Sequence, residues 1–500
     1  MPINYGEIIG LIKSSSKKMR ESPTKLKYKF AFKNLKDKYL DILGIYDGEY
    51  GYKGPFHVQI DLTNNCNNSC IACWCNSPLL QEKRLSEAEK QKHLPLELVK
   101  EFLDETERMG TKEVYYSGSG EPFMHPHIME VIEYTKKKRL TCHVNTNFTL
   151  LDKTKIGDLI DLGVDFLTVS VWAGTPETFC HVHPGSNEDV FFKLKNNLIY
   201  LNRKKKEKMN NPLIKIYDVI FNMNYFELEE MVSFAESTSS EFIEFTLADT
   251  IPNGTDILRL NEKQTQELIE ISKKIRRGAN KDNKMPSGLE LFQFHQFLRR
   301  ISVAKDVEEA KYDRNIINSM PCNAGWLFAR IMPDGEVHSC LKAHRIPTGS
   351  LYLNRFSEIW NSEKQSYFRK KTLAYEKNDP FFRLIGNDPS TKEAGCYKTC
   401  DDIGRNTWMF NRIGKLSLLE RLVLKFIATA LKSTRKLKPK EERLSRLKAS
   451  INSQKELPKK RNLFRWLILI LLSFYTFFYI VYFWFFMVFR NRLILGGRKE

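Results

Sequence analysis

The chain has 500 residues, 42% of them hydrophobic, and a formal net charge of +19. This length exceeds one ordinary domain, so we expect two or more folded units, each with its own core. Ten cysteines are too few for a disulfide scaffold, and no apolar segment follows the opening Met-Pro-Ile-Asn, which argues against a secretory signal peptide.

The positive charge is concentrated outside the middle of the chain. Residues 411–465 hold 17 Lys/Arg against 4 Asp/Glu, and residues 1–54 hold 11 basic against 6 acidic side chains. The rest of the chain is close to neutral, which is unlike a nucleic-acid-binding surface. Basic charge beside an apolar segment suits an anionic lipid surface. We therefore expect membrane lipid as a partner and no nucleic acid.

Residues 1–54 are predicted to form a basic helical lead-in, and residues 55–250 alternate predicted strands and helices. The predicted strands are residues 57–62, 113–117, 140–145, 166–172, 213–221 and 242–247. The predicted helices are residues 96–109, 128–137, 155–162, 189–208 and 226–237. Such alternation implies parallel pairing with right-handed crossovers. It predicts an α/β fold with an open, partial (β/α)6 barrel, whose ligands lie at the carboxyl ends of the strands.

Three further segments follow the predicted barrel. Residues 251–320 are predicted to form a helical connector, and residues 321–410 a second, small domain. Residues 411–465 are predicted to form a basic helical linker with breaks at Pro439 and Pro458.

Residues 466–489 are 24 consecutive residues without a charge. At about 1.5 Å per residue, a helix of this length spans about 36 Å, enough to cross a bilayer core of about 30 Å. Arg465 and Arg490 flank the segment, which is rich in aromatic residues. We predict one C-terminal transmembrane helix, followed by a tail at residues 490–500.

The first predicted strand leads into a loop that carries Cys66, Cys70 and Cys73 at the spacing C-x3-C-x2-C. Three thiols cannot saturate a four-iron cluster, which takes four ligands, so one iron stays open. A structural zinc site needs a fourth ligand, and Cys75 is the one candidate nearby in the sequence. The spacing resembles that of the radical S-adenosylmethionine (radical SAM) superfamily, in which the cofactor chelates the open iron.

Other segments extend this resemblance over residues 56–250. The tetrapeptide Ser-Gly-Glu-Pro at 119–122 is similar to the family's Gly-Gly-Glu-Pro turn, with Ser119 in place of the first glycine. Asn145 lies in a segment like the family's Thr-Asn-Gly, and Ser170 stands where members often contact the ribose. The resemblance implies a 4Fe–4S cluster, S-adenosyl-L-methionine, and cofactor contacts at Ser119, Gly120, Glu121, Asn145 and Ser170.

Four more cysteines lie in the second predicted domain: Cys322, Cys340, Cys396 and Cys400. A hairpin predicted to turn at Pro-Asp-Gly, residues 333–335, separates the first two. The region resembles the auxiliary-cluster extension called SPASM, or its shorter relative Twitch. Four thiols imply one fully ligated second 4Fe–4S cluster that transfers electrons; zinc, or no metal, is the alternative.

The remaining thiols carry less information. Cys142 lies in a predicted strand and is interpreted as a core residue, while Cys180 lies in a predicted loop. Cys75 and Cys180 are interpreted as structural. The sharper alternative makes each a hydrogen donor to a substrate radical, with His181 or His183 near Cys180.

The resemblance implies reductive cleavage of S-adenosylmethionine, giving a 5′-deoxyadenosyl radical that abstracts hydrogen from a substrate C–H bond. Because a tether would concentrate the enzyme at lipid, we expect an oxidoreductase or epimerase of a membrane-associated sugar or lipid-linked precursor. One alternative is a maturase of a ribosomally made peptide. Another is a non-catalytic metal-binding membrane protein, against which the intact cysteine motif argues.

Iron–sulfur assembly and a flavodoxin- or ferredoxin-like electron donor belong to the cytosol. We therefore expect a single-pass membrane protein whose catalytic domain lies on the cytoplasmic side. The basic linker before the apolar segment agrees with this orientation.

Overall fold

The computed structural model describes residues 39–208, 211–281, 291–376, 379–386, 396 and 398–451. Contacts divide the chain into one unit that ends at Leu431 and another that begins at Lys432. Within the described ranges, no helix is both long and apolar enough to span a bilayer. The predicted transmembrane segment, residues 466–489, lies outside those ranges, so it stays a prediction.

The strands of the described chain form one sheet in the order β6-β5-β4-β3-β2-β1-β7-β8-β9. They are β1 (His57–Ile60), β2 (Glu113–Tyr116), β3 (Thr141–Thr146), β4 (Phe166–Ser170), β5 (Leu213–Ile220), β6 (Phe242–Leu247), β7 (Phe328–Ile331), β8 (Glu336–His338) and β9 (Gly349–Ser350). The first six pair in parallel, each with its sequence neighbour. The predicted α/β partial barrel is therefore confirmed.

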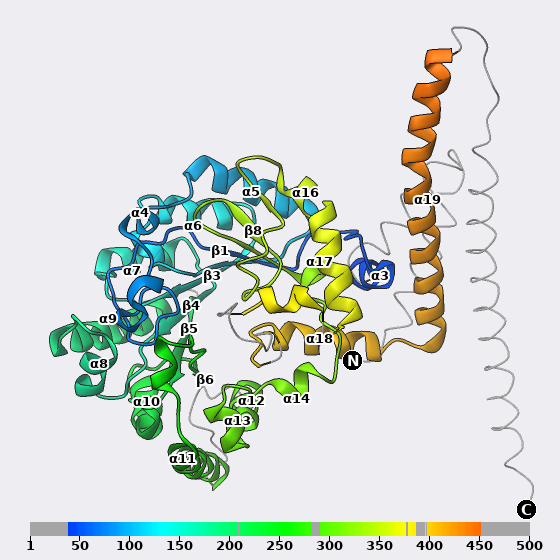
Figure 1. Ribbon diagram of the computed structural model, residues 1–500. Helices are drawn as coiled ribbons and strands as arrows, with labels where there is room; N and C mark the ends of the chain where they lie inside the picture. Colours follow the sequence, from blue (N-terminus) through cyan, green and yellow to red (C-terminus); the bar gives the residue numbers. More distant parts are fainter. Residues whose placement is uncertain are drawn as a thin grey trace, which may run out of the picture. The chain divides into compact units, whose positions relative to one another are not determined.

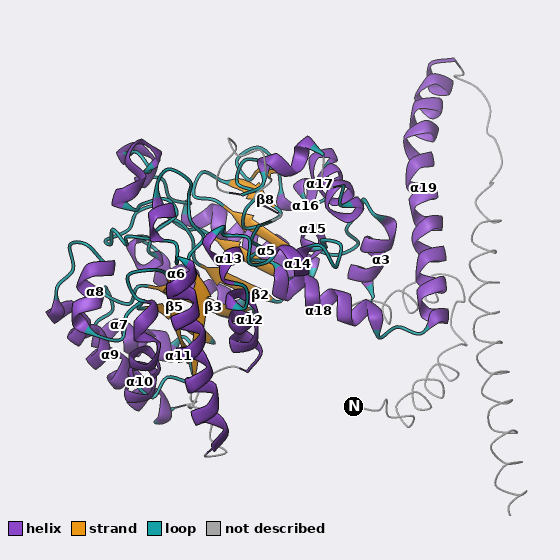
Figure 2. Cartoon of the chain, turned by 60° about the horizontal axis from the view of Figure 1, so that its bottom comes forward, coloured by secondary structure: helices purple, strands orange, loops and turns teal. Residues whose placement is uncertain are grey.

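Helices follow each strand of the barrel and cover its outer face (Figure 1). They are α5 (Leu96–Met109), α6 (Ile128–Lys137), α7 (Lys153–Asp161), α8 (Pro176–Val182), α9 (Glu188–Lys206) and α10 (Leu228–Ser237). Short elements before them are α3 (Leu40–Asp47), η1 (Pro78–Lys83), α4 (Glu87–Lys90) and η2 (Pro122–Met124). Figure 2 shows the strands surrounded by these helices.

The connector and the C-terminal region are helical over much of their described ranges. The connector contains α11 (Glu262–Lys281), α12 (Leu291–Ile301), α13 (Ala304–Glu308) and α14 (Arg314–Ile317). Beyond it lie α15 (Ala324–Leu327), α16 (Phe356–Ile359), α17 (Glu363–Ala374), η5 (Pro380–Leu384), α18 (Ile403–Gly414) and α19 (Leu418–Ile451). The linker prediction was wrong in one detail, because α19 continues through Pro439, at the cost of a backbone hydrogen bond.

Alternation along the strands divides the sheet into two faces. Val58, Val114 and Val144 are buried against the covering helices in the main core. Their neighbours His57, Glu113 and Tyr115 are only partly buried, on the opposite face. Successive side chains of a strand point to opposite faces, so this second face forms the barrel lumen. The lumen is therefore lined by polar and aromatic side chains.

The auxiliary region joins the barrel directly. Strand β7 pairs in parallel with β1, with His57 opposite Phe328 and Ile60 opposite Ile331. Strand β8 then pairs with β7 in the opposite direction, through a turn in which Gly335 has φ of +79°. The predicted Pro-Asp-Gly hairpin is confirmed, and it extends the barrel sheet.

The sequence analysis placed Cys180 in a loop, and this prediction was wrong. The residue lies in helix α8. The Thr175 side chain accepts a hydrogen bond from the Thr178 amide, and Pro176 occupies the first turn. A capping threonine followed by proline is a helix-start signal, so the sequence contained the information.

Asp218, on β5, provides a test of the packing behind the sheet. Its side chain is buried on the helix-covered face, and burial raises its pKa from 3.8 to about 8. Its Oδ1 accepts from the Trp172 amide at 2.7 Å, while Oδ2 is buried without a hydrogen-bond partner.

Between those two pKa values the folded protein retains a proton that the unfolded chain releases, so stability falls as pH rises. An Asp218→Asn variant keeps the acceptor but cannot ionise. We expect its thermal stability relative to the parent to increase steadily from pH 5 to pH 8. Parallel stability curves for the two proteins over this range would show that Asp218 does not titrate as described.

Candidate active site and auxiliary cysteine site

The loop after β1 holds Cys66, Cys70 and Cys73 as free thiols. The Asn68 amide lies 3.5 Å from the Cys66 sulfur, and the Asn76 amide lies 3.3 Å from the Cys73 sulfur. Such amide hydrogen bonds stabilise a thiolate more than a thiol. The backbone of the loop therefore favours the thiolate forms of Cys66 and Cys73.

Burial acts in the opposite direction on two of these thiols. It raises the pKa of Cys66 to about 12, and it holds the pKa of Cys70 well above its ordinary value. A bound cation reverses such a preference, because metal coordination deprotonates a thiol. Among the described residues, no three metal-ligand side chains converge on a single-ion site. Each cysteine of a four-iron cluster ligates a different iron, so the loop fits a cluster without that convergence.

Cys75 lies behind the loop. Its sulfur lies 3.3 Å from the Ser119 carbonyl oxygen and 3.8 Å from the Cys73 sulfur. The hydrogen bond from Cys75 is the largest influence on Cys73, and it lowers the pKa of Cys73 to about 7. Cys75 thus contacts both the cysteine loop and the turn at 118–122. Its suggested role as a hydrogen donor stays a prediction.

The turn at residues 118–122 packs closely against the chain that leads into the cysteine loop. A β-carbon added to Gly120 would lie 2.4 Å from the Asn65 and Thr63 carbonyl oxygens. Gly118 has φ of +132°, where side chains are strained. Only glycine fits at either position. The turn and the cysteine loop are therefore held at one fixed separation.

Ser119 replaces a family glycine without loosening this turn. Its amide donates to Asp61 Oδ2 at 3.2 Å, and its hydroxyl contacts Asn64 Oδ1. The side chain is buried and fully used within the protein. The substitution adds a connection to the cysteine loop and leaves the backbone path of the turn intact.

The Glu121 carboxylate also bonds within the protein. It accepts from the Thr146 hydroxyl at 2.7 Å, the Asn147 amide at 2.7 Å and the Phe123 amide at 3.2 Å. Burial raises the pKa of Glu121 to about 7. These contacts occupy the carboxylate. A ligand at the turn would therefore contact backbone groups and not the Glu121 side chain. Glu121 instead fastens the end of β2 to the end of β3.

The other two predicted cofactor-binding residues lie at neighbouring strand ends. Asn145 donates to the Ser117 hydroxyl at 3.1 Å, across the β2–β3 pair. Ser170 ends β4, one strand further on. Both are partly buried and lie on the lumen face with Ser117. The structure thus brings these polar groups together at the carboxyl ends of the strands, next to the turn.

Cys142 and Cys180 lie apart from this edge. Cys142 is fully buried in the main core, which agrees with its interpretation as a core residue. Cys180 is on α8, whose last residue, Val182, accepts the Ile71 amide of the cysteine loop at 3.0 Å. Burial raises the pKa of Cys180, and the carboxylates of Glu188 and Glu177 raise it further. Its suggested role as a hydrogen donor stays a prediction.

A buried ion pair connects the site to the auxiliary region, and the sequence analysis did not identify it. Arg330, on β7, lies with its Nη2 2.5 Å from Asp61 Oδ2, and both side chains are buried. Arg330 also donates to the Leu341 carbonyl at 3.1 Å, and its guanidinium lies 5.2 Å from the Trp74 ring. One arginine thereby contacts the residue that follows β1, the cysteine loop and the chain after Cys340.

The four auxiliary cysteines come together from three segments. Cys322 precedes α15, Cys340 follows β8, and Cys396 and Cys400 precede α18. They are close enough for Cys322, Cys396 and Cys400 each to raise the pKa of Cys340, although burial contributes more. The Lys342 amide lies 3.4 Å from the Cys340 sulfur, and Asn406 lies 3.7 Å from the Cys322 sulfur. Four free, partly buried thiols, two of them with amide donors, fit one cluster.

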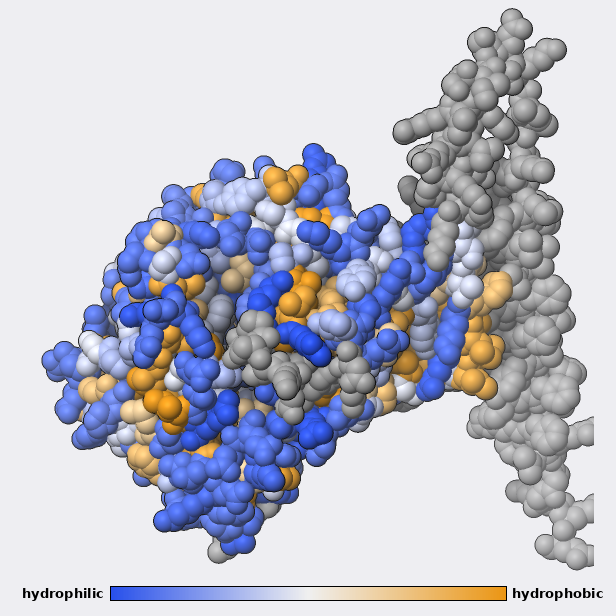
Figure 3. Space-filling view, in the orientation of Figure 1, coloured by the Kyte–Doolittle hydropathy of each residue, from blue (hydrophilic) through white to orange (hydrophobic). Residues whose placement is uncertain are grey.

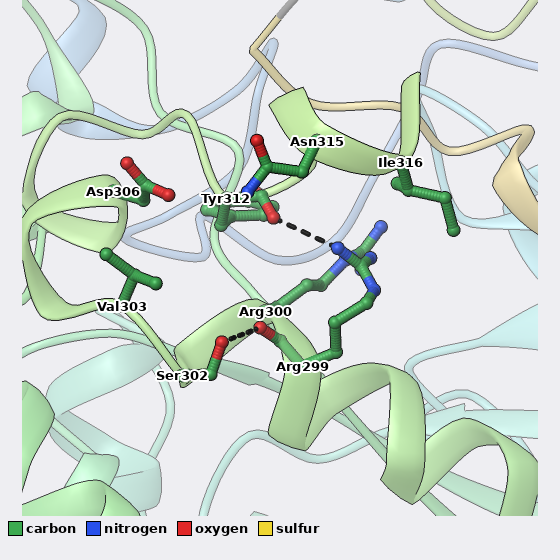
Figure 4. A pocket seen from close by; sticks show the side chains of 8 residues that line it. All are labelled: Arg299, Arg300, Ser302, Val303, Asp306, Tyr312, Asn315 and Ile316. Carbon is green, nitrogen blue, oxygen red and sulfur yellow. Dashed lines mark hydrogen bonds between the residues drawn. The ribbon is translucent and has the colours of Figure 1, made fainter. Parts of the chain in front are cut away.

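Two arginines of α12 hold the backbone at Cys400. Arg299 and Arg300 both pair with Asp313, at 2.6 and 3.0 Å. Asp313 accepts the Cys400 amide at 3.0 Å, and Arg300 donates to the Cys400 carbonyl at 3.3 Å. The pocket lined by these arginines, about 80 Å³, is shown in Figure 4. Both arginines are paired with Asp313, so we interpret them as a support for the backbone at Cys400.

The auxiliary site borders the barrel lumen. Arg300, which holds Cys400, also donates to the Thr246 hydroxyl of β6 at 2.9 Å, on the lumen face. Lys342, two residues after Cys340, pairs with Asp249 at 2.8 Å just beyond β6. The lumen therefore has the cysteine loop at the strand ends and the auxiliary cysteines beside its β6 edge.

A cluster of titratable side chains lies near the amino ends of β1, β2 and β3, and the sequence analysis did not identify it. His57 Nδ1 lies 2.9 Å from Glu113 Oε2, Tyr115 donates to the same oxygen at 3.0 Å, and His143 Nε2 lies at 3.6 Å. The ring of His143 stacks between Tyr115 and Phe166. Burial lowers the pKa of His143 to about 4, so this ring is neutral at pH 7. The three strands bring together residues that are too far apart in sequence to form a motif.

The Asp61–Arg330 pair leads to a direct stability test. An Arg330→Gln variant leaves the Asp61 carboxylate buried without its cation, which costs about 3–5 kcal/mol. The double variant Asp61→Asn/Arg330→Gln removes both charges, so we expect it to recover part of that loss. Both are measured by denaturant unfolding of anaerobically purified protein. A loss below about 1 kcal/mol in the single variant would contradict this role.

The turn offers a matched pair of substitutions. In Gly120→Ala the new methyl group must displace two backbone carbonyls, so we expect at least about tenfold weaker binding of S-adenosylmethionine. Ser119→Gly loses one side-chain contact but keeps the backbone path, and should bind within about threefold of the parent. Equilibrium binding to the reconstituted protein distinguishes them. Equal affinities for the two variants would show that the close packing of the turn is irrelevant to the cofactor.

Comparison with known proteins agrees with this geometry. Residues 60–235 match the radical SAM superfamily, and residues 322–380 match the iron–sulfur cluster-binding domain called SPASM. The fold resembles that of SuiB from Streptococcus suis, with a TM-score of 0.52 and 14% identity over 80% of this chain and 88% of that one. At this identity the likeness concerns the fold alone.

Three curated relatives match parts of the chain. The tungsten-containing aldehyde ferredoxin oxidoreductase cofactor-modifying protein of Pyrococcus furiosus is 25% identical over 36% of this chain and 47% of its own. The subtilosin biosynthesis protein AlbA of Bacillus subtilis is 21% identical over 63% and 61%. The PqqA peptide cyclase of Gluconobacter oxydans is 27% identical over 23% and 30%.

These matches span less than two thirds of each relative, so they identify domains and not a whole activity. The radical SAM domain binds a 4Fe–4S cluster with S-adenosylmethionine, and the SPASM domain binds auxiliary iron–sulfur clusters. Fold, motifs and family matches agree: this chain carries a radical SAM domain at residues 60–235 and a SPASM domain at residues 322–380.

Proposed function

We propose that this protein is a radical SAM enzyme that modifies a peptide, as a maturase of a ribosomally made precursor. Two relatives support this class. AlbA takes part in the biosynthesis of a bacteriocin, and its similarity extends over 317 residues, while the PqqA cyclase acts on a peptide. This reading replaces a sugar or lipid-linked precursor as the preferred substrate.

The observation that carries the proposal is the position of the lumen between two thiol sites. Arg300 joins the lumen residue Thr246 to the backbone of Cys400, and Arg330 joins Asp61 to the chain after Cys340. A side chain that enters the lumen can therefore approach both the cysteine loop and the auxiliary cysteines.

Residues of this chain would hold the cofactors as follows. Cys66, Cys70 and Cys73 would hold the first cluster, and the backbone of the turn at 118–122, with Asn145 and Ser170, would receive S-adenosylmethionine. Bound together, these groups supply a radical capable of taking hydrogen from an unactivated C–H bond. Cys322, Cys340, Cys396 and Cys400 would hold the second cluster, beside the substrate.

The protein's own contribution is positioning and exclusion of water. Asp61, Ser119 and Gly120 hold the turn against the cysteine loop, so the cofactor site has a fixed shape. Tyr115, His143 and Phe166 form a stacked aromatic wall on the lumen side. An aromatic wall of this kind would offer an apolar or aromatic side chain of the substrate a surface to stack on.

A second candidate is action on a membrane-associated small molecule, as an oxidoreductase or epimerase. The Pyrococcus furiosus relative, a cofactor-modifying protein, supports a non-peptide substrate. The uncharged segment at 466–489 and the basic residues before it support a membrane location. We propose a single-pass membrane protein with its catalytic domain in the cytoplasm, where a flavodoxin- or ferredoxin-like donor could supply electrons.

The peptide proposal is tested by co-expression with a short precursor encoded next to this gene. We expect a change in precursor mass that depends on Cys70, because Cys70→Ala removes one ligand of the first cluster. Cys396→Ala should lower iron by up to one cluster, prevent the mass change and spare the cleavage of S-adenosylmethionine without substrate. Mass spectrometry, iron analysis and a 5′-deoxyadenosine assay give the three measurements.

Two results would contradict these assignments. Unchanged iron in Cys396→Ala would remove the second cluster from the account. Binding or turnover of a glycan or lipid-linked precursor, with no peptide modified, would favour the second candidate.

A further inference from the structure

Helix α19 carries a stripe of exposed apolar side chains in the part that belongs to the unit ending at Leu431. Leu418, Leu422 and Phe426 are 75%, 55% and 53% exposed, and Leu419 is 48% exposed. Residues four apart lie on the same side of a helix, so the first three form one line. We name these four residues the α19 face. Figure 3 shows an apolar patch where α18 meets α19.

The opposite side of the helix already has its packing partners. Leu424 and Ala428 are buried in a small core with Ile42, Trp326 and Met409. Tyr39 also donates to Glu420 at 3.0 Å, close to the start of the helix. The helix is therefore anchored by its inner side, and the α19 face is not needed to hold it there.

Basic side chains border the α19 face. At 100° per residue, Arg421 and Lys425 fall on one flank of the apolar line, and Lys415 precedes the helix. Arg421 donates to the Leu416 and Gly414 carbonyls, which orient the guanidinium without neutralising it. Lys425 lies 5.7 Å from the centre of the Tyr46 ring. An exposed apolar stripe with a cationic flank is the pattern of an interfacial helix.

We infer that the α19 face binds the surface of an anionic phospholipid bilayer. The leucines and Phe426 would enter the boundary between headgroups and acyl chains, while Lys415, Arg421 and Lys425 would contact lipid phosphates. Continuity of the chain supports this occupant over a second protein. The same helix leads into residues with a large excess of positive charge, and these lead into the uncharged segment at 466–489.

This inference does not depend on the substrate, and its choice of occupant rests on the membrane location proposed above. A tether at 466–489 would bring the protein to a membrane but would not determine which surface of the catalytic unit faces it. The α19 face determines that surface. It also goes beyond the excess of basic residues, because it names the apolar contacts that a purely electrostatic attachment would lack.

The test uses the full chain with a photo-cross-linking residue at two matched positions. Phe426→p-benzoylphenylalanine reports on the α19 face. Phe192→p-benzoylphenylalanine is the control, because Phe192 is also a helical phenylalanine and is 48% exposed, on α9. Each protein is irradiated with phosphatidylcholine vesicles that contain or lack phosphatidylglycerol. Unchanged circular dichroism and iron content show that the variants fold.

We expect lipid adducts at position 426 in about tenfold excess over position 192, dependent on the anionic lipid. Adding Lys415→Glu and Lys425→Glu should reduce the adducts at 426 severalfold. Three results would overturn the inference: equal adducts at the two positions, adducts at 426 that map to another segment of this chain, or adducts to a second copy of it.

Discussion

The Asp61–Arg330 ion pair is the contact on which the arrangement of the two thiol sites depends. The pair is buried, and Asp61 also accepts from Ser119 and from Gln59. Removing such charges from water is costly, and bidentate geometry with additional hydrogen bonds offsets that cost. In return the pair gives specificity, because Asp61 binds the turn of the cofactor site while Arg330 belongs to the auxiliary strand.

The pair acts together with the β7–β1 pairing, and both make the auxiliary region part of the barrel. The Trp74 ring, one residue beyond Cys73, lies 5.2 Å from the Arg330 guanidinium and 6.1 Å from the His344 ring. His344 lies four residues after Cys340 in the chain. The cysteine loop and the auxiliary cysteines are therefore connected through the buried ion pair and the partly buried Trp74 and His344. Fixed positions of this kind are what catalysis by proximity and orientation needs.

Local patterns were enough to predict most of the barrel. The predicted ranges matched the six strands of the barrel to within about two residues at each end, and the three-cysteine spacing identified the loop. The α8 capping signal at Thr175-Pro176 was present but was not used. Long-range partners could not be found in this way: Arg330 lies 269 residues from Asp61, and His57, Glu113 and His143 meet only because their strands pair. No periodicity in a single chain encodes such meetings.

Electron paramagnetic resonance of the anaerobically reduced full chain tests the central claim most directly. The account predicts signals from two iron–sulfur clusters, of which one changes when S-adenosylmethionine is added, because only the three-cysteine loop leaves an iron open to it. The second signal should stay unchanged, since four thiolates complete its ligation. Two clusters whose signals both stay unchanged when S-adenosylmethionine is added, or zinc in place of iron at the loop, would contradict the account.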